Sequence, residues 1–334
     1  MTMGSLQTHI QPLVNLLQKK PLLAIFEINL QCNSKCGYCD LPLNQGRYEL
    51  SRTEIKSIFT DLYHNGLRYV FIQGGEPTLR KDLLEIIGDL HQTGLKLSLI
   101  TNGTRLTEQF IEALAQYPVD LSISLDTLDR DLYRKIRGAD QLKLVLAGLQ
   151  RLQDYPHPKY ITCIVSAQNR NKVLEVVRFA RQSGFMPVVG AYHWDIERYG
   201  KVDPELQYEN SQARAVFEEV IESNLVPRGY FRNYLEDNVR WLSGDKLNAC
   251  DAGRYSIAID ASGNVAGCLA MSHAGNLREQ KLSTILANMD FEKIDNCSNQ
   301  SSCNMMCSRV IGSNLRQPIS AILTPVRLEE ETIA

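Results

Sequence analysis

Three cysteines lie within eight residues near the start of the chain: Cys32, Cys36 and Cys39, in the stretch QCNSKCGYCD. Thiolates are good ligands for zinc and for iron–sulfur clusters. A structural zinc site needs four ligands, so three cysteines would require a distant fourth ligand to complete such a site.

A second group of cysteines lies near the other end of the chain. Its members are Cys250, Cys268, Cys297, Cys303 and Cys307, and Cys163 stands alone between the two groups. The total of nine is odd, and cysteines gathered in two groups indicate metal or iron–sulfur sites rather than a disulfide framework. A four-thiolate zinc site is an alternative for the second group.

Three further motifs could form a binding site with the first cysteine group. They are GGEPT (74–78), TNGT (101–104) and SISLD (122–126), and each follows or ends a predicted strand. Glycines let the backbone approach a ligand closely, and the polar side chains offer hydrogen-bonding groups. Because the carboxyl ends of parallel strands meet at one face, these motifs and the cysteine loop should share one rim.

Strand-like and helix-like segments alternate through the first two thirds of the chain. The predicted strands are 22–30, 68–73, 95–101, 119–125, 160–166 and 185–192, and the predicted helices are 52–65, 80–93, 107–117, 140–153 and 170–183. Such alternation predicts a parallel sheet covered by helices. Six units suit an α/β fold with a partial (β/α)6 TIM-like barrel.

Composition and periodicity change after the barrel region. We expect the barrel at 20–200, a helical connection at 201–245 with a helix at 210–223, a small C-terminal α+β unit at 246–312 and a tail at 313–334. The segment 254–270 reads as a hairpin with a turn at Ala261–Asn264. A short helix and a cysteine-rich loop follow it.

Charge and hydropathy exclude several classes of function. The chain has 334 residues, 44% of them hydrophobic, and a formal net charge of −2. A near-neutral balance indicates no DNA-binding surface, and no apolar run reaches the ~20 residues that a membrane span needs. We expect a cytoplasmic protein without a membrane span.

The pattern C-x3-C-x2-C with Tyr38 before its last cysteine, followed by GGEP, resembles the radical S-adenosylmethionine superfamily over about residues 20–195. The resemblance implies that the three cysteines hold a catalytic [4Fe–4S] cluster whose fourth iron takes S-adenosylmethionine. Reductive cleavage then gives a 5′-deoxyadenosyl radical that removes a hydrogen atom from substrate. An electron donor such as flavodoxin or ferredoxin is implied as a partner.

The resemblance also implies which residues bind S-adenosylmethionine. They are Tyr38, Gly74, Gly75, Glu76, Asn102, Ser124, Asp126 and Arg137. The GGE residues would receive the methionine amino group, and Ser124 and Asp126 would approach the ribose or methionine portion, with Asn102 nearby. Tyr38 would contact adenine, and Arg137 would pair with the methionine carboxylate.

The second cysteine group resembles the SPASM domain or its shorter form, twitch. The spacing Cys250-x12-Gly263-x4-Cys268 and then Cys303-x3-Cys307 carries this resemblance, although Ile294 replaces one cysteine of the SPASM motif. It implies one auxiliary [4Fe–4S] cluster on Cys250, Cys268, Cys307 and either Cys303 or Cys297, of which we choose Cys303.

Alternate strand residues should face the barrel interior. Glu27 on the first strand and His193 after the sixth are the candidate catalytic bases, and Cys163 is expected to be a buried core thiol.

Only about 20 residues precede the first strand, so we expect no N-terminal peptide-binding domain. The expected function is therefore hydrogen-atom abstraction from a small molecule or short peptide in natural-product or cofactor biosynthesis. It could be an oxidation with the auxiliary cluster as electron acceptor. The alternatives are a maturase that crosslinks or epimerises a ribosomally made peptide, and a non-catalytic iron–sulfur scaffold.

Overall fold

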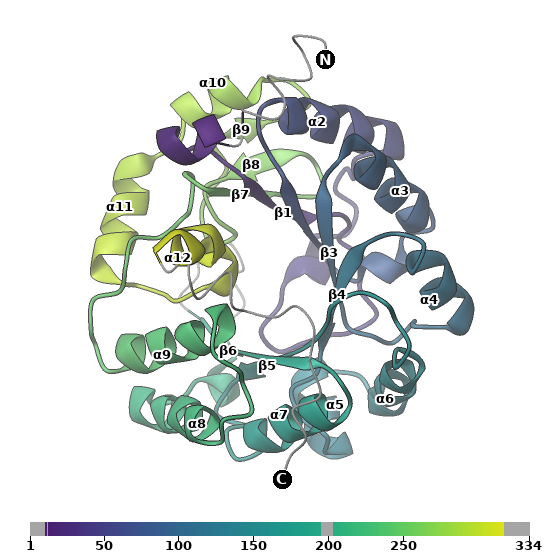
Figure 1. Ribbon diagram of the computed structural model, residues 1–334, viewed down its shortest axis with the longest axis vertical. Coiled ribbons are helices and arrows are strands. Elements are labelled where there is room, and N and C mark those ends of the chain that lie inside the picture. The colour runs from purple at the N-terminus through teal and green to yellow at the C-terminus, as the bar shows by residue number, and fades with distance from the viewer. Residues whose placement is uncertain (1–10, 12, 195–202, 317–334) are drawn as a thin grey trace.

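A curved nine-stranded sheet forms the centre of the protein, whose computed structural model describes residues 11, 13–194 and 203–316 (Figure 1). The strand order is β6-β5-β4-β3-β2-β1-β7-β8-β9. Neighbouring strands from β6 to β7 are parallel. The first six are β1 (Leu23–Glu27), β2 (Tyr69–Gln73), β3 (Lys96–Thr101), β4 (Val119–Ser124), β5 (Lys159–Val165) and β6 (Met186–Ala191). The predicted partial (β/α)6 barrel is confirmed.

Helices cover the outer face of this sheet (Figure 1). They are α2 (Arg52–His64), α3 (Leu83–Thr93), α4 (Glu108–Leu114), α5 (Arg130–Arg137), α6 (Leu142–Arg151) and α7 (Val173–Gln182), with short 3-10 turns η1 (Leu41–Asn44) and η2 (Pro77–Leu79). Ser51 and Glu54 form the predicted capping box at the start of α2, and the Thr107 side chain caps α4. The helix α5 was not predicted.

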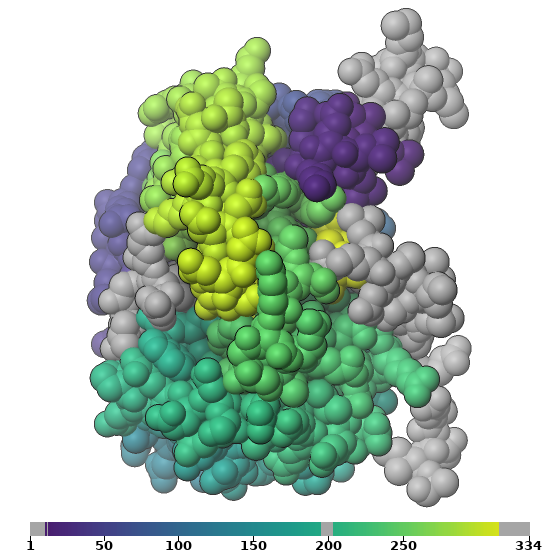
Figure 2. Space-filling model, turned by 90° about the vertical axis from the view of Figure 1, so that its left-hand side faces the viewer, coloured from purple at the N-terminus to yellow at the C-terminus, as the bar shows by residue number. Residues whose placement is uncertain are grey.

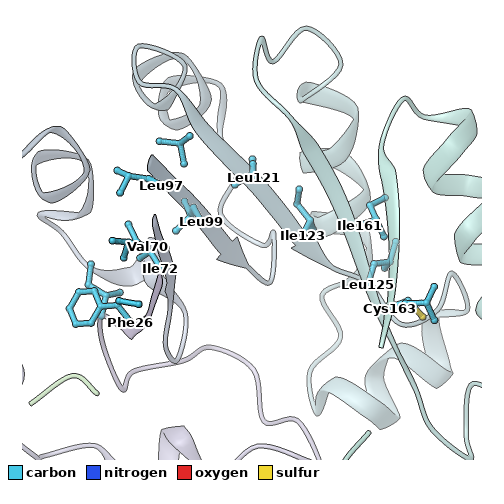
Figure 3. Close-up of a cluster of buried hydrophobic side chains, with 14 of the residues drawn as sticks. Phe26, Val70, Ile72, Leu97, Leu99, Leu121, Ile123, Leu125, Ile161 and Cys163 are labelled. Carbon is cyan, nitrogen blue, oxygen red and sulfur yellow. The ribbon is translucent and has the colours of Figure 1, made fainter. Parts of the chain in front are cut away.

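The main core lies between the sheet and these helices. Figure 3 shows it as a row of side chains from successive strands, labelled Phe26, Val70, Ile72, Leu97, Leu99, Leu121, Ile123, Leu125, Ile161 and Cys163. Side chains alternate between the two faces of a strand, so the residues between these point into the barrel. Cys163 is 1% exposed, which confirms the prediction of a buried core thiol.

The C-terminal part of the chain continues the barrel sheet. β7 (Ser256–Ile259) pairs in parallel with β1, and β8 (Asn264–Ala266) and β9 (Gly275–Asn276) follow antiparallel. The predicted hairpin is therefore present, but it lies on the edge strand of the barrel rather than in a sheet of its own.

The remaining helices connect and cover this extension. They are η3 (Pro204–Leu206), α8 (Asn210–Glu222), α9 (Tyr230–Leu242), α10 (Leu282–Ala287), α11 (Phe291–Gln300), η4 (Met306–Ser308) and α12 (Val310–Arg316). α8 confirms the helix predicted at 210–223. Figure 2 shows the yellow C-terminal segment lying directly on the green helical segment, in agreement with the contact between α12 and α9.

Two sequence predictions differ from the structure here. Cys297 lies in α11 rather than in a loop, because the Asp290 side chain caps a helix that runs to Gln300. α12 crosses the predicted start of the tail at residue 313, and residues 317–334 lie outside the described residues. None of the described helices has the length and apolar character needed to cross a membrane.

Candidate active site and auxiliary cluster site

The first cysteine group lies in the loop after β1, which the end of α5 holds in place. The backbone N–H of Lys35 donates to the carbonyl of Arg137 at 2.9 Å, and that of Gly37 donates to Ile136 at 3.1 Å. Gly138 ends α5 with φ +66°, and a Cβ there would collide with the Lys35 carbonyl. The helix missed in the sequence therefore positions the cysteine loop.

The TNGT motif holds the same loop from the other side. Asn102 Nδ2 donates to Asn33 Oδ1 at 2.7 Å, and Asn33 Nδ2 donates to Thr104 Oγ1 at 2.8 Å. Asn102 was predicted to lie near S-adenosylmethionine, and the structure adds that it links the cysteine loop to the rim. Asn33 carried no role in the sequence prediction, although its place beside Cys32 was a signal.

The GGEP motif continues the pairing of β2 with the chain after β1. The N–H groups of Gly75 and Glu76 donate to the carbonyls of Asn29 and Gln31, both at 2.8 Å. A Cβ at Gly74 or Gly75 would clash with these same residues, which explains the two glycines.

Glu76 is fully buried, and its carboxylate organises the rim. It accepts hydrogen bonds from Thr101 Oγ1 at 2.6 Å, from the N–H of Asn102 at 2.7 Å, and from the hydroxyl and N–H of Thr78. Burial raises the pKa of Glu76, and these hydrogen bonds oppose the shift. Its predicted contact with the methionine amino group stays a prediction.

Asp126 and Arg137 form a buried ion pair at 2.7 Å, with side chains 1% and 7% exposed. Asp126 also accepts from the N–H of Ile164 at 2.9 Å and from the Tyr38 hydroxyl at 3.3 Å. Burial raises the pKa of Tyr38, so its hydroxyl stays protonated and donates. The structure thus brings Tyr38, Asp126 and Arg137 together, and it places the half-buried Ser124 at the end of β4 on the same rim. Their roles toward S-adenosylmethionine stay predictions.

Several buried polar atoms at this rim have no partner within the described residues. They are Asn29 Oδ1, beside Gly74, Arg137 Nε and the Tyr133 hydroxyl. Burying such atoms unpaired is costly, so they fit a site where a bound group supplies their partners. A cofactor with amino, carboxylate and ribose groups meets that need.

A cavity of about 390 Å³ occupies the interior of the barrel. It is lined by inward-facing residues of β2 to β6, by aromatic residues of α9, and by residues 305–307 and Val310. Among the described residues that line it, none is a lysine or an arginine, and Asp120 is the one acid. Burial raises the pKa of Asp120 to about 6.

The two candidate bases differ in their relation to this cavity. His193 lines it and is half-buried, with its ring 4.8 Å from that of Trp241. Burial lowers the pKa of His193 to about 4, although a hydrogen bond to the backbone of Asn304 opposes the shift. The ring is therefore neutral near pH 7. Glu27 is fully buried in register with Gln73, a lining residue, but does not itself line the cavity. Catalytic roles for both stay predictions.

Each of the five cysteines of the second group lies within electrostatic reach of at least one other member. Cys297 and Cys303 share a hydrogen bond, which lowers the pKa of Cys297 and raises that of Cys303. Cys250, Cys268 and Cys307 are within electrostatic reach of this pair or of one another. Because Cys303 and Cys297 are both present, the choice between them as fourth ligand stays a prediction.

Helix α9 and the segment before Cys250 position this group. The hydroxyls of Tyr230 and Tyr234 donate to the carbonyls of Met306 and Asn304, at 3.2 and 2.6 Å. The N–H of Cys250 donates to Ser298 Oγ at 3.0 Å. The N–H of Ala270 points at Cys268 Sγ at 3.4 Å, as that of Ser34 does at Cys32 Sγ.

The surroundings of this group fit a bound cluster. Asn304 is fully buried, and both polar atoms of its side chain lack a partner within the described part of the chain. Arg309, also buried, lies beside the same cysteines. Sequence reasoning missed both residues, although Arg309 is the one basic residue between Cys297 and Val310. No three His, Cys, Asp or Glu side chains in residues 13–194 and 203–313 converge as a single bound metal ion requires.

Comparison with known families now decides the assignment. Residues 26–180 match the radical SAM superfamily, and residues 250–309 match the SPASM iron–sulfur cluster-binding domain. The chain contains a radical SAM domain and a SPASM domain. The first domain implies a [4Fe–4S] cluster with S-adenosylmethionine, and the second implies auxiliary iron–sulfur clusters.

Two relatives match this chain over different lengths. A probable GTP 3′,8-cyclase of Thermococcus kodakarensis is 32% identical over 46% of this chain and 51% of that protein. The chain thus spans about half the length of this relative. The mycofactocin maturase MftC of Mycolicibacterium smegmatis is 29% identical over 81% of this chain and 72% of that protein.

Solved structures share the fold of this radical SAM–SPASM chain. Streptococcus suis SuiB bound to its precursor peptide SuiA has a TM-score of 0.67 at 19% identity, covering 84% of this chain and 69% of that chain. The protein anSMEcpe with bound AdoMet and a Cp18Cys peptide has a TM-score of 0.60 at 18% identity, covering 79% and 80%. These identities support the fold alone.

Proposed function

We propose that the protein is a radical S-adenosylmethionine enzyme that removes a hydrogen atom from a peptide side chain or a small molecule bound inside the barrel. The observation that carries this proposal is the cavity inside the barrel. Gln73, the residue before the GGEP motif, lines one part of it, and Cys307 of the auxiliary group lines another. A substrate there would lie against the auxiliary group and next to the chain segment that leads into the GGEP motif.

The chain's own residues prepare this site. Cys32, Cys36 and Cys39 would hold the catalytic cluster, which with S-adenosylmethionine supplies hydrogen-atom abstraction when bound. The aromatic side chains of α9 line the cavity and would exclude water from the substrate. His193, neutral and with Nε2 free of any partner among the described residues, could accept a proton from a substrate hydroxyl.

The cavity favours a peptide side chain or an uncharged or cationic molecule over a nucleoside triphosphate. Binding of a triphosphate calls for lysine or arginine side chains, and the described lining offers one carboxylate and several aromatic rings instead. This supports a function like that of MftC, a maturase, more than that of the GTP 3′,8-cyclases. A role in natural-product or cofactor biosynthesis follows by analogy.

An oxidation is the reaction type that the position of Cys307 supports. An auxiliary cluster that touches the cavity wall could take up the second electron when the substrate is oxidised. A flavodoxin or ferredoxin would supply the electron that starts the reaction. A non-catalytic scaffold is disfavoured because the complete rim of GGEP, TNGT and SISLD would serve no purpose in it.

The test is formation of 5′-deoxyadenosine by the anaerobically reconstituted, reduced protein with S-adenosylmethionine. We expect slow formation without substrate, none in Cys36→Ala, and no stimulation by GTP. Precursor peptides or small molecules made by neighbouring genes are the candidate substrates that should accelerate it. No product from a protein with a full iron content would refute the enzyme proposal, and stimulation by GTP would refute the proposed substrate class.

A further inference from the structure

Arg309 is a buried cation that forms no ion pair with any side chain in the part of the chain that the structure describes. It is 4% exposed, and its guanidinium donates to the carbonyls of Asn248 at 2.6 Å and Cys303 at 3.2 Å. Carbonyl groups satisfy its hydrogen bonds but carry no formal negative charge that would neutralise it. No ion pair found among the described residues includes it. A buried charge normally requires an opposite charge nearby, so this arrangement requires an explanation.

The Arg309 guanidinium lies beside part of the auxiliary group, within electrostatic reach of Cys250 and Cys297. The two carbonyls that it binds belong to Cys303 itself and to Asn248, two residues before Cys250. Arg309 therefore joins the two chain segments that carry these cysteines. The charges of Arg309 and of the buried Asp251 carboxylate both lie within electrostatic reach of Cys250.

The catalytic cysteine loop offers an instructive contrast. Arg137 there is buried as deeply, but Asp126 neutralises it at 2.7 Å. Among the described residues Arg309 has no ion-pair partner equivalent to Asp126, so its positive charge can act on the cysteines. Thiolates and a cluster carry negative charge, and reduction adds one more electron to it. A fixed positive charge in a desolvated position makes that reduction easier.

We propose that Arg309 is the counter-charge of the auxiliary cluster and raises its reduction potential. The proposal rests on the proposed function only in requiring that a cluster binds to these cysteines, and it holds whatever the substrate. A raised potential would suit a cluster that accepts an electron from the barrel cavity, which Cys307 lines. Arg309 is thus a positioning and tuning residue rather than a catalytic one.

The test measures the midpoint potential of the auxiliary cluster alone, by redox titration followed by electron paramagnetic resonance. The full-length protein carries Cys32→Ala, Cys36→Ala and Cys39→Ala, so that only the auxiliary cluster remains. In this background we compare Arg309→Met and Arg309→Gln, which remove the charge, with Arg309→Lys, which keeps it. Lys293→Gln is the control, since it removes an exposed cation near Cys297.

We expect the neutral variants to lower the ratio of reduced to oxidised cluster at least tenfold at the wild-type midpoint, equivalent to about 59 mV for one electron. Arg309→Lys should stay within about threefold of wild type, and so should Lys293→Gln because solvent screens its charge. Wild-type potential in a neutral variant with full iron content would overturn the proposal. So would an equal shift in Arg309→Lys.

If the neutral variants bind no iron, they have no midpoint potential to measure, and the iron content of the three Arg309 variants tests the proposal instead. Iron retained by Arg309→Lys but lost from Arg309→Met and Arg309→Gln would support a need for the charge. Iron lost from all three variants would mean that the shape of the arginine, and not its charge, is what the site requires, and would contradict the proposal. Because no step depends on S-adenosylmethionine or substrate, failure here is distinct from failure of the proposed function.

Discussion

The two cysteine groups are built in different ways. The catalytic group lies in one loop of eight residues, and α5 and the TNGT motif hold that loop through short hydrogen bonds. The auxiliary group is gathered from a loop before β7, the turn after β8, α11 and the segment before α12. The first site is thus local in sequence, whereas the second exists only once the C-terminal part has folded onto the barrel.

The two sites also differ in how the charge of their buried arginine is balanced. The buried arginine beside the catalytic loop is neutralised by Asp126, whereas the buried arginine beside the auxiliary group donates to two carbonyls and forms no ion pair with the residues that the structure describes. A neutralised pair can shape a cofactor pocket with little effect on charge. An uncompensated cation can stabilise a negatively charged cluster. The comparison suggests that the first site is built to bind S-adenosylmethionine and the second to exchange electrons.

The largest expected effect separates the two sites by removing one of them. Cys36→Ala should lower 5′-deoxyadenosine formation to background and leave about four fewer iron atoms per chain, while the auxiliary cluster remains. Product assay and iron analysis on the same sample check this. Cys163→Ala is the control, because Cys163 lies in the core and should leave iron content and product unchanged. Loss of all iron from Cys36→Ala would show that the sites are not independent.

The second prediction removes the negative charge that neutralises Arg137, the buried arginine of the catalytic rim. Asp126→Asn leaves Arg137 buried without its anion, which typically lowers the free energy of unfolding by about 3–5 kcal/mol. Chemical denaturation of the metal-free protein measures it. The matched control is Asp140→Asn, whose pair with Arg130 is exposed and should contribute less than about 1 kcal/mol. Equal losses in the two variants would contradict the role given to the buried pair.

The third prediction tests the local anchoring of the cysteine loop. Gly138→Ala places a Cβ against the Lys35 carbonyl at a positive φ, so it should destabilise the protein by about 1–3 kcal/mol and lower the catalytic iron content. Gly184→Ala is the control for φ alone, since φ there is +76° and no atom lies within reach of a Cβ. Thermal unfolding and iron analysis should show a clearly smaller effect for Gly184→Ala. Similar effects would mean that α5 does not hold the loop.

The smallest expected effect concerns Asp120, which lines the barrel cavity, and it depends on pH. The pKa of Asp120 is raised to about 6, so the folded protein binds this proton more tightly than the unfolded chain. Stability should therefore fall as pH rises from about 4 through 6. Asp120→Asn removes the penalty and should stabilise the protein by about 1–3 kcal/mol at pH 7, with no gain near pH 4. Denaturation at the two pH values checks this, and a gain that is the same at both would contradict it.

The sequence predicted the local features of the molecule, but not those that depend on contacts between distant segments. Strand ends, the three-cysteine loop and the GGEP, TNGT and SISLD motifs depend on short-range pattern, and the fold confirmed their arrangement on one rim. The pairing of β7 with β1 and the approach of Cys297 to Cys303 depend on tertiary packing, which no local pattern encodes. The role of α5 was missed because its apolar positions are few and the carbonyls at its end carry its function.

The most direct test of the central claim is electron–nuclear double resonance on the reduced protein with S-adenosylmethionine isotopically labelled in its amino and carboxylate groups. The account predicts hyperfine coupling between the label and the reduced catalytic cluster, absent in Cys36→Ala. A fully assembled catalytic cluster that shows no coupling to either group would contradict it.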